Sequence, residues 1–338
     1  MDELIIKENT EIYVLCPAYT KTGGPELLHQ LVKELTDNGI NAYITYFKIN
    51  KNNNEYTPND FKKYITEYRL LKDINDHKDN IVITPEAVLP LKLTKKIKNT
   101  KKILWWLSVD NFKKTHTIKN VMKNYPIYTA LILMIKGEIT YNFDYIKTFN
   151  YHLCQSHYSI EYLKSNEITN RYYLSDYIND EYLILGDEYG EKEDIITYNP
   201  KKGIEFTKKL IKSSPNLNFI PIKNLTTEQV KELLLKSKVY IDFGNHPGKD
   251  RIPREAAMCG CCIITNKQGS AKYYEDVSIN DEFKFEDNEE NINAIRNKIT
   301  NCIENYDIEI KKFNTYRNDI KQEKQKFKED VKKFFNTS

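Results

Sequence analysis

Residues 244–271, GNHPGKDRIPREAAMCGCCIITNKQGSA, place a loop rich in glycine and proline between an apolar run and a helical pattern. The run 239–243 predicts a buried strand, and the helix after the loop is expected to begin near Pro253. Glu255 would then lie in the first turn of that helix, at the carboxyl end of the strand. A carboxylate in this position can accept two hydrogen bonds from the vicinal hydroxyls of a ribose. The alternative is that Glu255 only complements the helix dipole.

The same order of apolar run, loop and helix repeats along the rest of the chain. Strands that alternate with helices form parallel βαβ units, so the fold class is α/β with two doubly wound sheets. Ligands bind such sheets outside the carboxyl ends of the strands. The expected strands are 12–16, 42–47, 81–84, 103–107 and 151–155 in the first half, and 195–198, 218–221, 239–243 and 262–265 in the second.

An acidic, glycine-containing stretch near 175–192 separates the two halves. We therefore expect an N-terminal Rossmann-like domain at 1–178 and a C-terminal Rossmann-like domain at 179–304. The remaining segment, 305–338, is expected to form a charged C-terminal helix.

The composition excludes several classes of protein. The 51 basic and 48 acidic residues nearly cancel, which gives no reason to expect a nucleic-acid partner. The N-terminus has acidic residues where a signal peptide needs basic ones, and the apolar stretch 130–135 is far shorter than the roughly 20 residues that cross a bilayer. These features predict a cytoplasmic protein. Cys259, Cys261 and Cys262 surround a glycine and lead into an apolar strand, so we expect small buried thiols and no metal site.

The sequence PREAAMCGCCIITNKQGSA at 253–271 resembles the donor-site signature of the glycosyltransferase family 4 group, in which a glutamate opens a helix before an apolar strand. The resemblance implies the GT-B fold, with two Rossmann-like domains facing each other across a cleft and the C-terminal helix crossing back to the first domain. It also implies transfer of a sugar from a nucleotide-diphosphate sugar to an acceptor hydroxyl, with Glu255 holding the ribose. Lysines and helix N-termini would stabilise the leaving diphosphate, so no metal cofactor is expected.

Other segments match the resemblance at the carboxyl ends of expected strands. YNPKKG at 198–203 offers Lys201 and Lys202, whose positive charges would neutralise the pyrophosphate, and Asn199 as a further donor-binding residue. TGGPE at 22–26 offers Gly23 and Gly24, where the backbone can approach the donor phosphate and sugar closely. The donor-binding set is completed by Asp250, Arg251, Gly269 and Ser270.

One departure from the family pattern concerns the contact that orients the donor sugar. The family has an earlier glutamate that is separated from the second by seven intervening residues, and Pro247 occupies that position here. His246 and Asp250 are the nearest side chains that could replace it. The variant HPGKDRIPRE resembles a divergent branch linked to surface polysaccharides. This implies a role in capsule or lipopolysaccharide synthesis, with a glycan or lipid-linked acceptor.

The polar end of the fourth expected strand, WWLSVDN at 105–111, supplies the candidate catalytic residue. Asp110 is the candidate base that removes the proton of the acceptor hydroxyl. The alternative is that Asp110 or Asn111 caps the next helix. A base at Asp110 favours inversion of the sugar, whereas a capping residue leaves retention open.

Six lysines between Lys92 and Lys102 form a basic cluster. We interpret the cluster as a solvated helix face, and the alternative is attraction to anionic lipid headgroups, which would place the protein at the inner face of the cytoplasmic membrane. The apolar segment YTALILMI at 128–135 is expected to pack in the core; the alternative is that it lines an acceptor groove.

Two other functions remain open. An epimerase on the same fold would need further acid and base residues, which the sequence does not reveal. A catalytically degenerate scaffold that binds a nucleotide sugar or a glycan is motivated by the missing glutamate. Release of nucleoside diphosphate without an acceptor separates an enzyme from such a scaffold.

Overall fold

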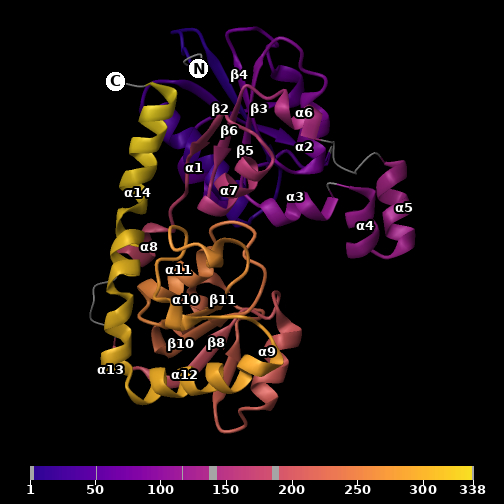
Figure 1. Cartoon of the computed structure of the whole chain (residues 1–338). Helices are drawn as coiled ribbons and strands as arrows, with labels where there is room; N and C mark the ends of the chain where they lie inside the picture. Colours follow the sequence, from indigo (N-terminus) through magenta and orange to yellow (C-terminus); the bar gives the residue numbers. More distant parts are fainter. Residues whose placement is uncertain (1–3, 51, 116, 137–142, 185–189, 337–338) are drawn as a thin grey trace. The chain divides into compact units, whose positions relative to one another are not determined.

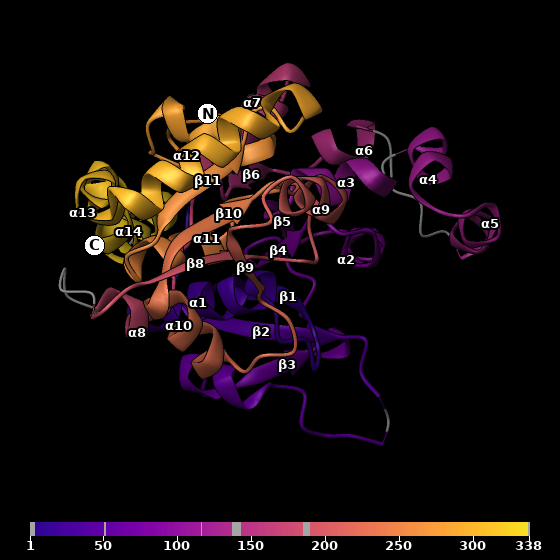
Figure 2. The ribbon, with the colours of Figure 1, turned by 90° about the horizontal axis from the view of Figure 1, so that it is seen from below.

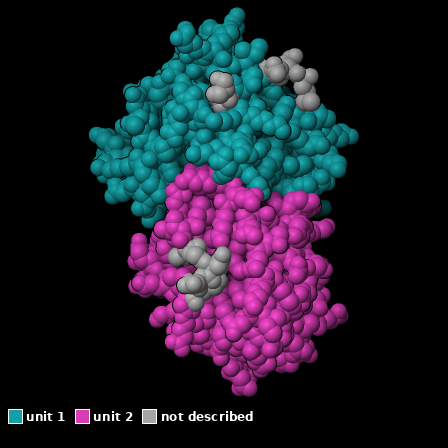
Figure 3. Space-filling view, turned by 90° about the vertical axis from the view of Figure 1, so that its left-hand side faces the viewer, with its two compact units in different colours: residues 1–176, 325–338 teal, residues 177–324 magenta. Residues whose placement is uncertain are grey.

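A computed structural model of the chain describes residues 4–50, 52–115, 117–136, 143–184 and 190–336 (Figure 1). The chain divides into two compact units, coloured separately in Figure 3. Unit 1 comprises Met1–Asp176 together with Gln325–Ser338, and unit 2 comprises Tyr177–Lys324. The last helix, α14 (Asn314–Phe335), therefore contributes its final turns to unit 1. There the ring of Phe334 packs against Tyr151 and Tyr172.

Unit 1 is built on a seven-stranded parallel sheet with the order β3-β2-β1-β4-β5-β6-β7. Its central strands are covered on both faces, which explains their near-continuous apolar sequences. In β5 the side chains of Trp105 and Trp106 are completely buried. The strands are β1 Glu11–Pro17, β2 Asn41–Phe47, β3 Tyr68–Leu70, β4 Ile81–Pro85, β5 Lys101–Trp106, β6 Tyr151–Cys154 and β7 Arg171–Tyr173.

The longest helix that connects strands of unit 1 is α1, whose apolar face repeats every three to four residues and lies buried against β1 and β2. Figures 1 and 2 show α4 and α5 at the margin of the unit, beside α3 and away from the sheet. The helices are α1 Gly23–Asp37, α2 Val88–Thr94, α3 Val109–Thr115, α4 Ile118–Asn124, α5 Ile127–Ile135, α6 Phe143–Lys147 and α7 His157–Ser165.

Unit 2 is built on a five-stranded parallel sheet with the order β12-β11-β10-β8-β9. The strands are β8 Glu193–Tyr198, β9 Asn218–Pro221, β10 Ser237–Asp242, β11 Cys262–Asn266 and β12 Lys284–Phe285. The helices are α8 Asp180–Leu183, α9 Ile204–Lys212, α10 Thr227–Lys236, α11 Arg251–Met258, α12 Ile292–Glu304 and α13 Tyr306–Glu309.

Cysteines contribute to the core of unit 2, as expected from their apolar surroundings. Cys259, Cys261, Cys262 and Cys302 are buried free thiols. Burial raises the pKa of the Cys261 thiol to about 11, so this side chain is a neutral packing residue at physiological pH.

Each sheet changes direction of winding at one point. Chain order reverses between β1 and β4 in unit 1, and between β8 and β10 in unit 2. In open parallel sheets the crevice beside such a reversal, at the carboxyl ends of the strands, is the usual ligand site. The topology therefore selects the loops after β1, β4, β8 and β10 as the places to search for function.

Candidate functional site

The best-developed candidate site lies at the carboxyl edge of the sheet in unit 2. Three loops meet there: residues 199–203 after β8, 243–250 after β10, and 267–268 after β11. The first two flank the point where the winding of this sheet reverses. Each of the three loops contains or adjoins a residue expected from the sequence to bind the donor.

Glycines allow these loops to contact one another through their backbones. A Cβ atom on Gly203, which has a φ of +54°, would lie 1.9 Å from the carbonyl oxygen of Phe243. A Cβ on Gly244 would lie 2.2 Å from the Cβ of Lys202. Gly269, with a φ of +52°, approaches the His246 carbonyl equally closely. Side chains at these positions would force the loops apart, so the glycines fix the geometry of the edge.

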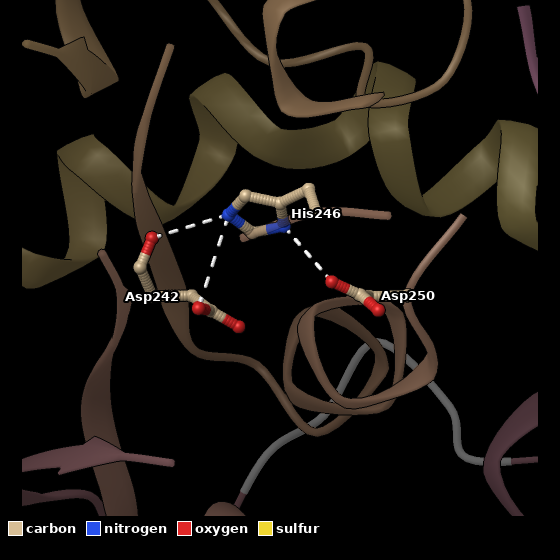
Figure 4. Close-up of side chains that lie close together, drawn as sticks. All are labelled: Asp242, His246 and Asp250. Atoms are coloured by element: carbon tan, nitrogen blue, oxygen red, sulfur yellow. Dashed lines mark hydrogen bonds and ion pairs between the residues drawn. The ribbon is translucent and has the colours of Figure 1, made fainter. Parts of the chain in front are cut away.

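A buried charge network runs through the loop after β10 (Figure 4). His246 Nδ1 lies 3.0 Å from Asp250 Oδ2, and its Nε2 lies 3.8 Å from Asp242 Oδ1. The Nζ of Lys202 donates a 2.7 Å hydrogen bond to the same Asp250 oxygen. The hydroxyl of Tyr240 donates a hydrogen bond to Asp242. Two carboxylates therefore face an imidazole and an ammonium group.

The surroundings of His246 favour its charged form. Burial by itself disfavours the imidazolium, but the charge of Asp242 and the hydrogen bond to Asp250 outweigh it and raise the pKa of His246. Burial likewise opposes ionisation of Asp250, whereas His246 and Lys202 lower the pKa of that carboxyl. These directions favour a charged His246 beside an ionised Asp250.

Among the described residues, one group of three side chains has an arrangement that could hold a metal ion. Asp242, His246 and Asp250 each offer a ligand atom within 4.8 Å of the others. In the geometry observed, however, the positive charge beside the carboxylates is supplied by the His246 ring and by Lys202. The absence of a metal requirement stays a prediction.

Asn199, Lys201 and Lys202 lie in the loop that leads into α9. Lys201 is exposed, and its backbone N–H donates to the side chain of Asn199, which closes the turn. Lys202 is partly buried by its pairing with Asp250. One lysine is therefore free to reach into solvent, while the other is held in a fixed direction.

The position of Glu255 differs from the expectation. Helix α11 begins at Arg251, two residues before Pro253, so Glu255 lies in its second turn and no acidic residue occupies the first. Proline fits the first turn of a helix because its missing N–H is not needed there, and this allows the earlier start. The side chain of Glu255 is partly buried. Burial and Asp242 raise the pKa of Tyr240, and the charges of Asp250 and Glu255 add smaller contributions.

Other expected donor-binding residues have roles within the protein. Arg251 donates to the carbonyl of Tyr177. The N–H of Ser270 donates to the His246 carbonyl, and its hydroxyl donates to the Gly248 carbonyl. Ser270 is completely buried, and residues 269–272 form a short 3-10 helix, η3 (Gly269–Lys272). Gly269 and Ser270 thus hold the loop after β10 in place.

A buried ion-pair cluster that the sequence did not suggest anchors the same loop from the other side. Arg254 and Lys249 place their charged groups 2.7 and 2.6 Å from the two carboxylate oxygens of Glu323 in α14. All three side chains are almost inaccessible to solvent. The contact joins residues 69 or more positions apart, which is why no local pattern announces it.

The candidate residues of unit 1 also lie at a carboxyl edge. Gly23 and Gly24 are the first two residues of α1. A Cβ on Gly24 would meet nothing nearer than 3.7 Å, so packing within the chain does not require glycine there. Space for close approach by a ligand is consistent with the expected role of this turn.

Asp110 lies within the first turn of α3 and is not its cap. Its Oδ1 accepts a 2.6 Å hydrogen bond from the hydroxyl of Tyr158 in α7. Lys113 donates to that hydroxyl at 2.7 Å and lies 3.9 Å from the carboxylate. About a fifth of the Asp110 side chain is exposed, so a reactant can reach the carboxylate. Tyr158 and Lys113 are functional candidates that sequence reasoning missed.

Glu86, just after β4, is a second carboxyl group that the sequence analysis overlooked. Its side chain is 4% exposed and accepts a 2.9 Å hydrogen bond from the N–H of Leu107. Burial raises the pKa of Glu86 to about 7, although hydrogen bonds from the backbone of Leu107, Glu86 itself and Ser108 oppose this shift. The side chain thereby links the end of β4 to the loop that leads into α3, the helix that carries Asp110.

A separate hollow of about 980 Å³ lies at the amino edge of the sheet in unit 2. Lys192, Lys238 and Tyr306 contribute to its lining. Because it is at the opposite edge from the loops described above, it takes no part in the candidate site.

Comparison with known proteins places the fold in a class. No protein-family model and no curated protein sequence matches the chain. Solved structures do: TarM from S. aureus is 17% identical over 78% of this chain, with a TM-score of 0.54, and the chain spans only 56% of TarM. Anabaena HepE, solved with UDP and glucose, is 10% identical with a TM-score of 0.63 and coverage of 98% of this chain and 100% of HepE. Sucrose-phosphate synthase from Thermosynechococcus elongatus is 12% identical with a TM-score of 0.55, covering 97% of this chain and 95% of the synthase.

These likenesses show the fold. The chain has the GT-B fold, α/β with two Rossmann-like units on parallel sheets of seven and five strands, as expected from the sequence. The GT-B fold that the resemblance implied is therefore confirmed, while the roles of residues 253–271 stay a prediction.

Proposed function

We propose that this protein is a glycosyltransferase that moves a sugar from a nucleotide-diphosphate sugar to an acceptor hydroxyl. The observation that carries the proposal is the carboxyl edge of the sheet in unit 2. At this edge, loops that contact one another at glycines lie beside the point where the strand order of the sheet reverses. These loops carry Lys201 and Lys202 and lead into α9 and into α11, the helix that contains Glu255.

The diphosphate of the donor would bind at the start of α9. Lys201 reaches into solvent, and Lys202 can turn from Asp250 toward an incoming phosphate. Asp250 would then remain paired with His246, so no buried carboxylate loses its counter-charge. With Lys202 turned in this way, its positive charge would stabilise the leaving diphosphate, which gains negative charge as the glycosidic bond breaks. Glu255 is proposed to accept hydrogen bonds from the ribose hydroxyls.

Unit 1 is proposed to bind the acceptor and to supply the base. Asp110 would take the proton of the attacking hydroxyl, and Tyr158 would orient the carboxylate through its short hydrogen bond. Such a base supports inversion at the sugar carbon. Gly23 and Gly24 would offer backbone N–H groups of the first turn of α1 to a ligand.

Uridine nucleotides are the first ligands to test, because HepE was solved with UDP and with UDP-glucose. We propose a glycan or a lipid-linked molecule as acceptor, in the synthesis of a surface polysaccharide at the inner face of the cytoplasmic membrane.

A nucleotide-sugar-binding scaffold is the second candidate, favoured by one observation. His246, a candidate to replace the missing family glutamate, is about 1% exposed and engaged with two aspartates. It is therefore poorly placed to orient a sugar. Release of nucleoside diphosphate from the donor by the wild type, reduced at least a hundredfold in Asp110→Asn, supports an enzyme; binding without release supports the scaffold.

The donor site is tested by thermal unfolding with a panel of nucleotides and nucleotide sugars. A ligand at a hundred times its Kd adds about 2.7 kcal/mol of stability. We expect one nucleoside diphosphate to raise the Tm of the wild type and of the control Glu232→Gln, whose side chain is exposed on α10. The shift should shrink in Glu255→Gln. A panel without any shift contradicts the proposal.

A further inference from the structure

The apolar segment 128–135 is not in the core, contrary to the expectation from the sequence. Of the nine residues of α5, only Ala130 is buried. The side chains of Ile127, Leu131 and Ile135 are 70, 53 and 85% exposed. Residues Tyr128, Ile132 and Met134 are exposed as well. An apolar segment resembles a core helix in sequence whether or not other elements cover it, and none of the elements that the structure describes covers this one.

Helix α4 extends the apolar surface. Ile118 and Met122, one turn apart, are 50 and 57% exposed, while Val121 packs inward. The two helices lie together at the margin of unit 1 in both views (Figures 1 and 2). Eight large apolar side chains are therefore exposed on two adjacent short helices: Ile118, Met122, Ile127, Tyr128, Leu131, Ile132, Met134 and Ile135. An exposed patch of this kind marks an interaction surface.

Positive charge surrounds this patch. From Asn111 to Lys136, both included, the sequence has five lysines and no acidic residue. Lys119, Lys123 and Lys136 are exposed. Lys92, the first lysine of the basic cluster noted in the sequence, donates to the carbonyl of Lys136 and so extends the positive surface to α2.

The length of the helices decides how such a surface can be used. Nine residues of α helix extend about 14 Å, which is less than half of the roughly 30 Å hydrocarbon core of a bilayer. Among the residues described, no helix is both long and apolar enough to cross a membrane. A short apolar helix flanked by lysines can instead lie in the interface, with its apolar side chains among the acyl chains and its lysines among anionic headgroups.

We propose that α4 and α5 form a docking surface for an anionic lipid bilayer. Apolar side chains would enter the interface, and Lys119, Lys123 and Lys136 would contact the headgroups. The proposal does not depend on the transferase activity, since it concerns binding to lipid alone. The proposed membrane contact lies mainly on α4 and α5. Of the basic cluster at 92–102, it includes Lys92.

Vesicle sedimentation of the full chain tests the proposal. We expect binding to vesicles of phosphatidylglycerol and phosphatidylcholine, and much weaker binding to phosphatidylcholine alone. The triple variant Ile127→Ser, Leu131→Ser, Ile135→Ser should lose at least tenfold in binding. The triple variant Lys119→Gln, Lys123→Gln, Lys136→Gln should lose about fivefold for each lysine removed, on anionic vesicles only.

A matched control replaces three equally exposed isoleucines elsewhere. Ile5→Ser, Ile184→Ser and Ile308→Ser remove side chains that are 62, 80 and 65% exposed, and they should leave vesicle binding unchanged. All three variants should keep the wild-type Tm, since exposed side chains contribute little to stability.

Insertion itself is measured with Tyr128→Trp, because the two native tryptophans are buried. Its emission should shift to the blue on anionic vesicles and be quenched by brominated acyl chains. Equal sedimentation of the wild type and the α5 variant overturns the proposal. The proposal is also overturned if the apolar patch mediates a dimer and the protein does not bind vesicles. In that case the molar mass of the wild type would be twice that of the α5 variant.

Discussion

The two carboxyl edges of this molecule are stabilised in different ways. In unit 2 the loops after β8, β10 and β11 contact one another through glycine backbones, and ion pairs neutralise the charges between them. In unit 1 a single buried carboxyl, Glu86, holds the loop after β5. The comparison indicates that the first edge combines close backbone contacts with paired charges, whereas the second includes a buried carboxyl whose pKa is raised by burial.

The largest effect should follow from breaking the ion pairs that anchor the loop after β10. Glu323→Ala leaves the buried charges of Arg254 and Lys249 without their carboxylate, which should lower the free energy of unfolding by about 3–5 kcal/mol. Denaturant unfolding measures this loss. The exposed pair of Glu289 and Lys209 provides the control: Glu289→Gln should leave the unfolding midpoint unchanged. Similar midpoints for the two variants would contradict the account.

The next effect separates glycine conformation from loop contact. Gly39 and Gly203 both have positive φ, but a Cβ on Gly39 has no neighbour within 4 Å. Gly39→Ala should cost about 1–2 kcal/mol from backbone strain alone. Gly203→Ala should cost about 1–3 kcal/mol more, because its Cβ would overlap the Phe243 carbonyl. Thermal unfolding of the pair measures the difference, and equal losses would show that the loops do not depend on this contact.

A smaller effect, specific to unit 1, is expected from pH. The pKa of Glu86 is raised to about 7 in the folded protein, against an ordinary value of 4.5. Between these values the folded protein retains a proton that the unfolded chain has lost. Stability from this group is therefore present below about pH 4.5 and falls as pH rises toward 7, by about 2–3 kcal/mol.

The measurement is the difference in unfolding free energy between the wild type and Glu86→Gln across pH 4–8. The wild type should lose stability relative to the variant as pH rises, and a flat difference would rule out a protonated Glu86. Asp76→Asn serves as a contrasting control. Burial raises the pKa of Asp76, but the hydrogen bonds from residues 98–100 together outweigh it and lower the pKa, so the contribution of Asp76 should instead be lost toward acid pH.

Much of the fold could be predicted because the buried strands have apolar sequences of their own. The nine expected strands correspond to β1, β2, β4, β5, β6 and β8–β11. The strands β3, β7 and β12 were missed. They are two or three residues long, and sequences such as Tyr68–Leu70 and Lys284–Phe285 contain no apolar run. Their pairing comes from the neighbouring strand and not from their own propensity.

The site was predictable only where backbone chemistry leaves a trace in the sequence. The glycines and prolines of residues 244–271 indicated a loop at this edge, whereas the contact of His246 with Asp242 depends on side-chain directions that spacing does not determine. Glu86 was missed because its partner is a backbone N–H of another loop. The exposure of α5 could not be foreseen, since an apolar sequence does not reveal what covers it.

The central claim is that the carboxyl edge of unit 2 binds a nucleoside diphosphate, and calorimetric titration tests it directly. The quantity to measure is the ratio of affinities for a nucleoside diphosphate and the corresponding monophosphate, with UDP and UMP as the first pair. The wild type and the control Lys208→Ala, on an exposed position of α9, should prefer the diphosphate at least tenfold. Lys202→Ala should lose most of that preference while its affinity for the monophosphate changes little. An unchanged preference in Lys202→Ala would contradict the claim.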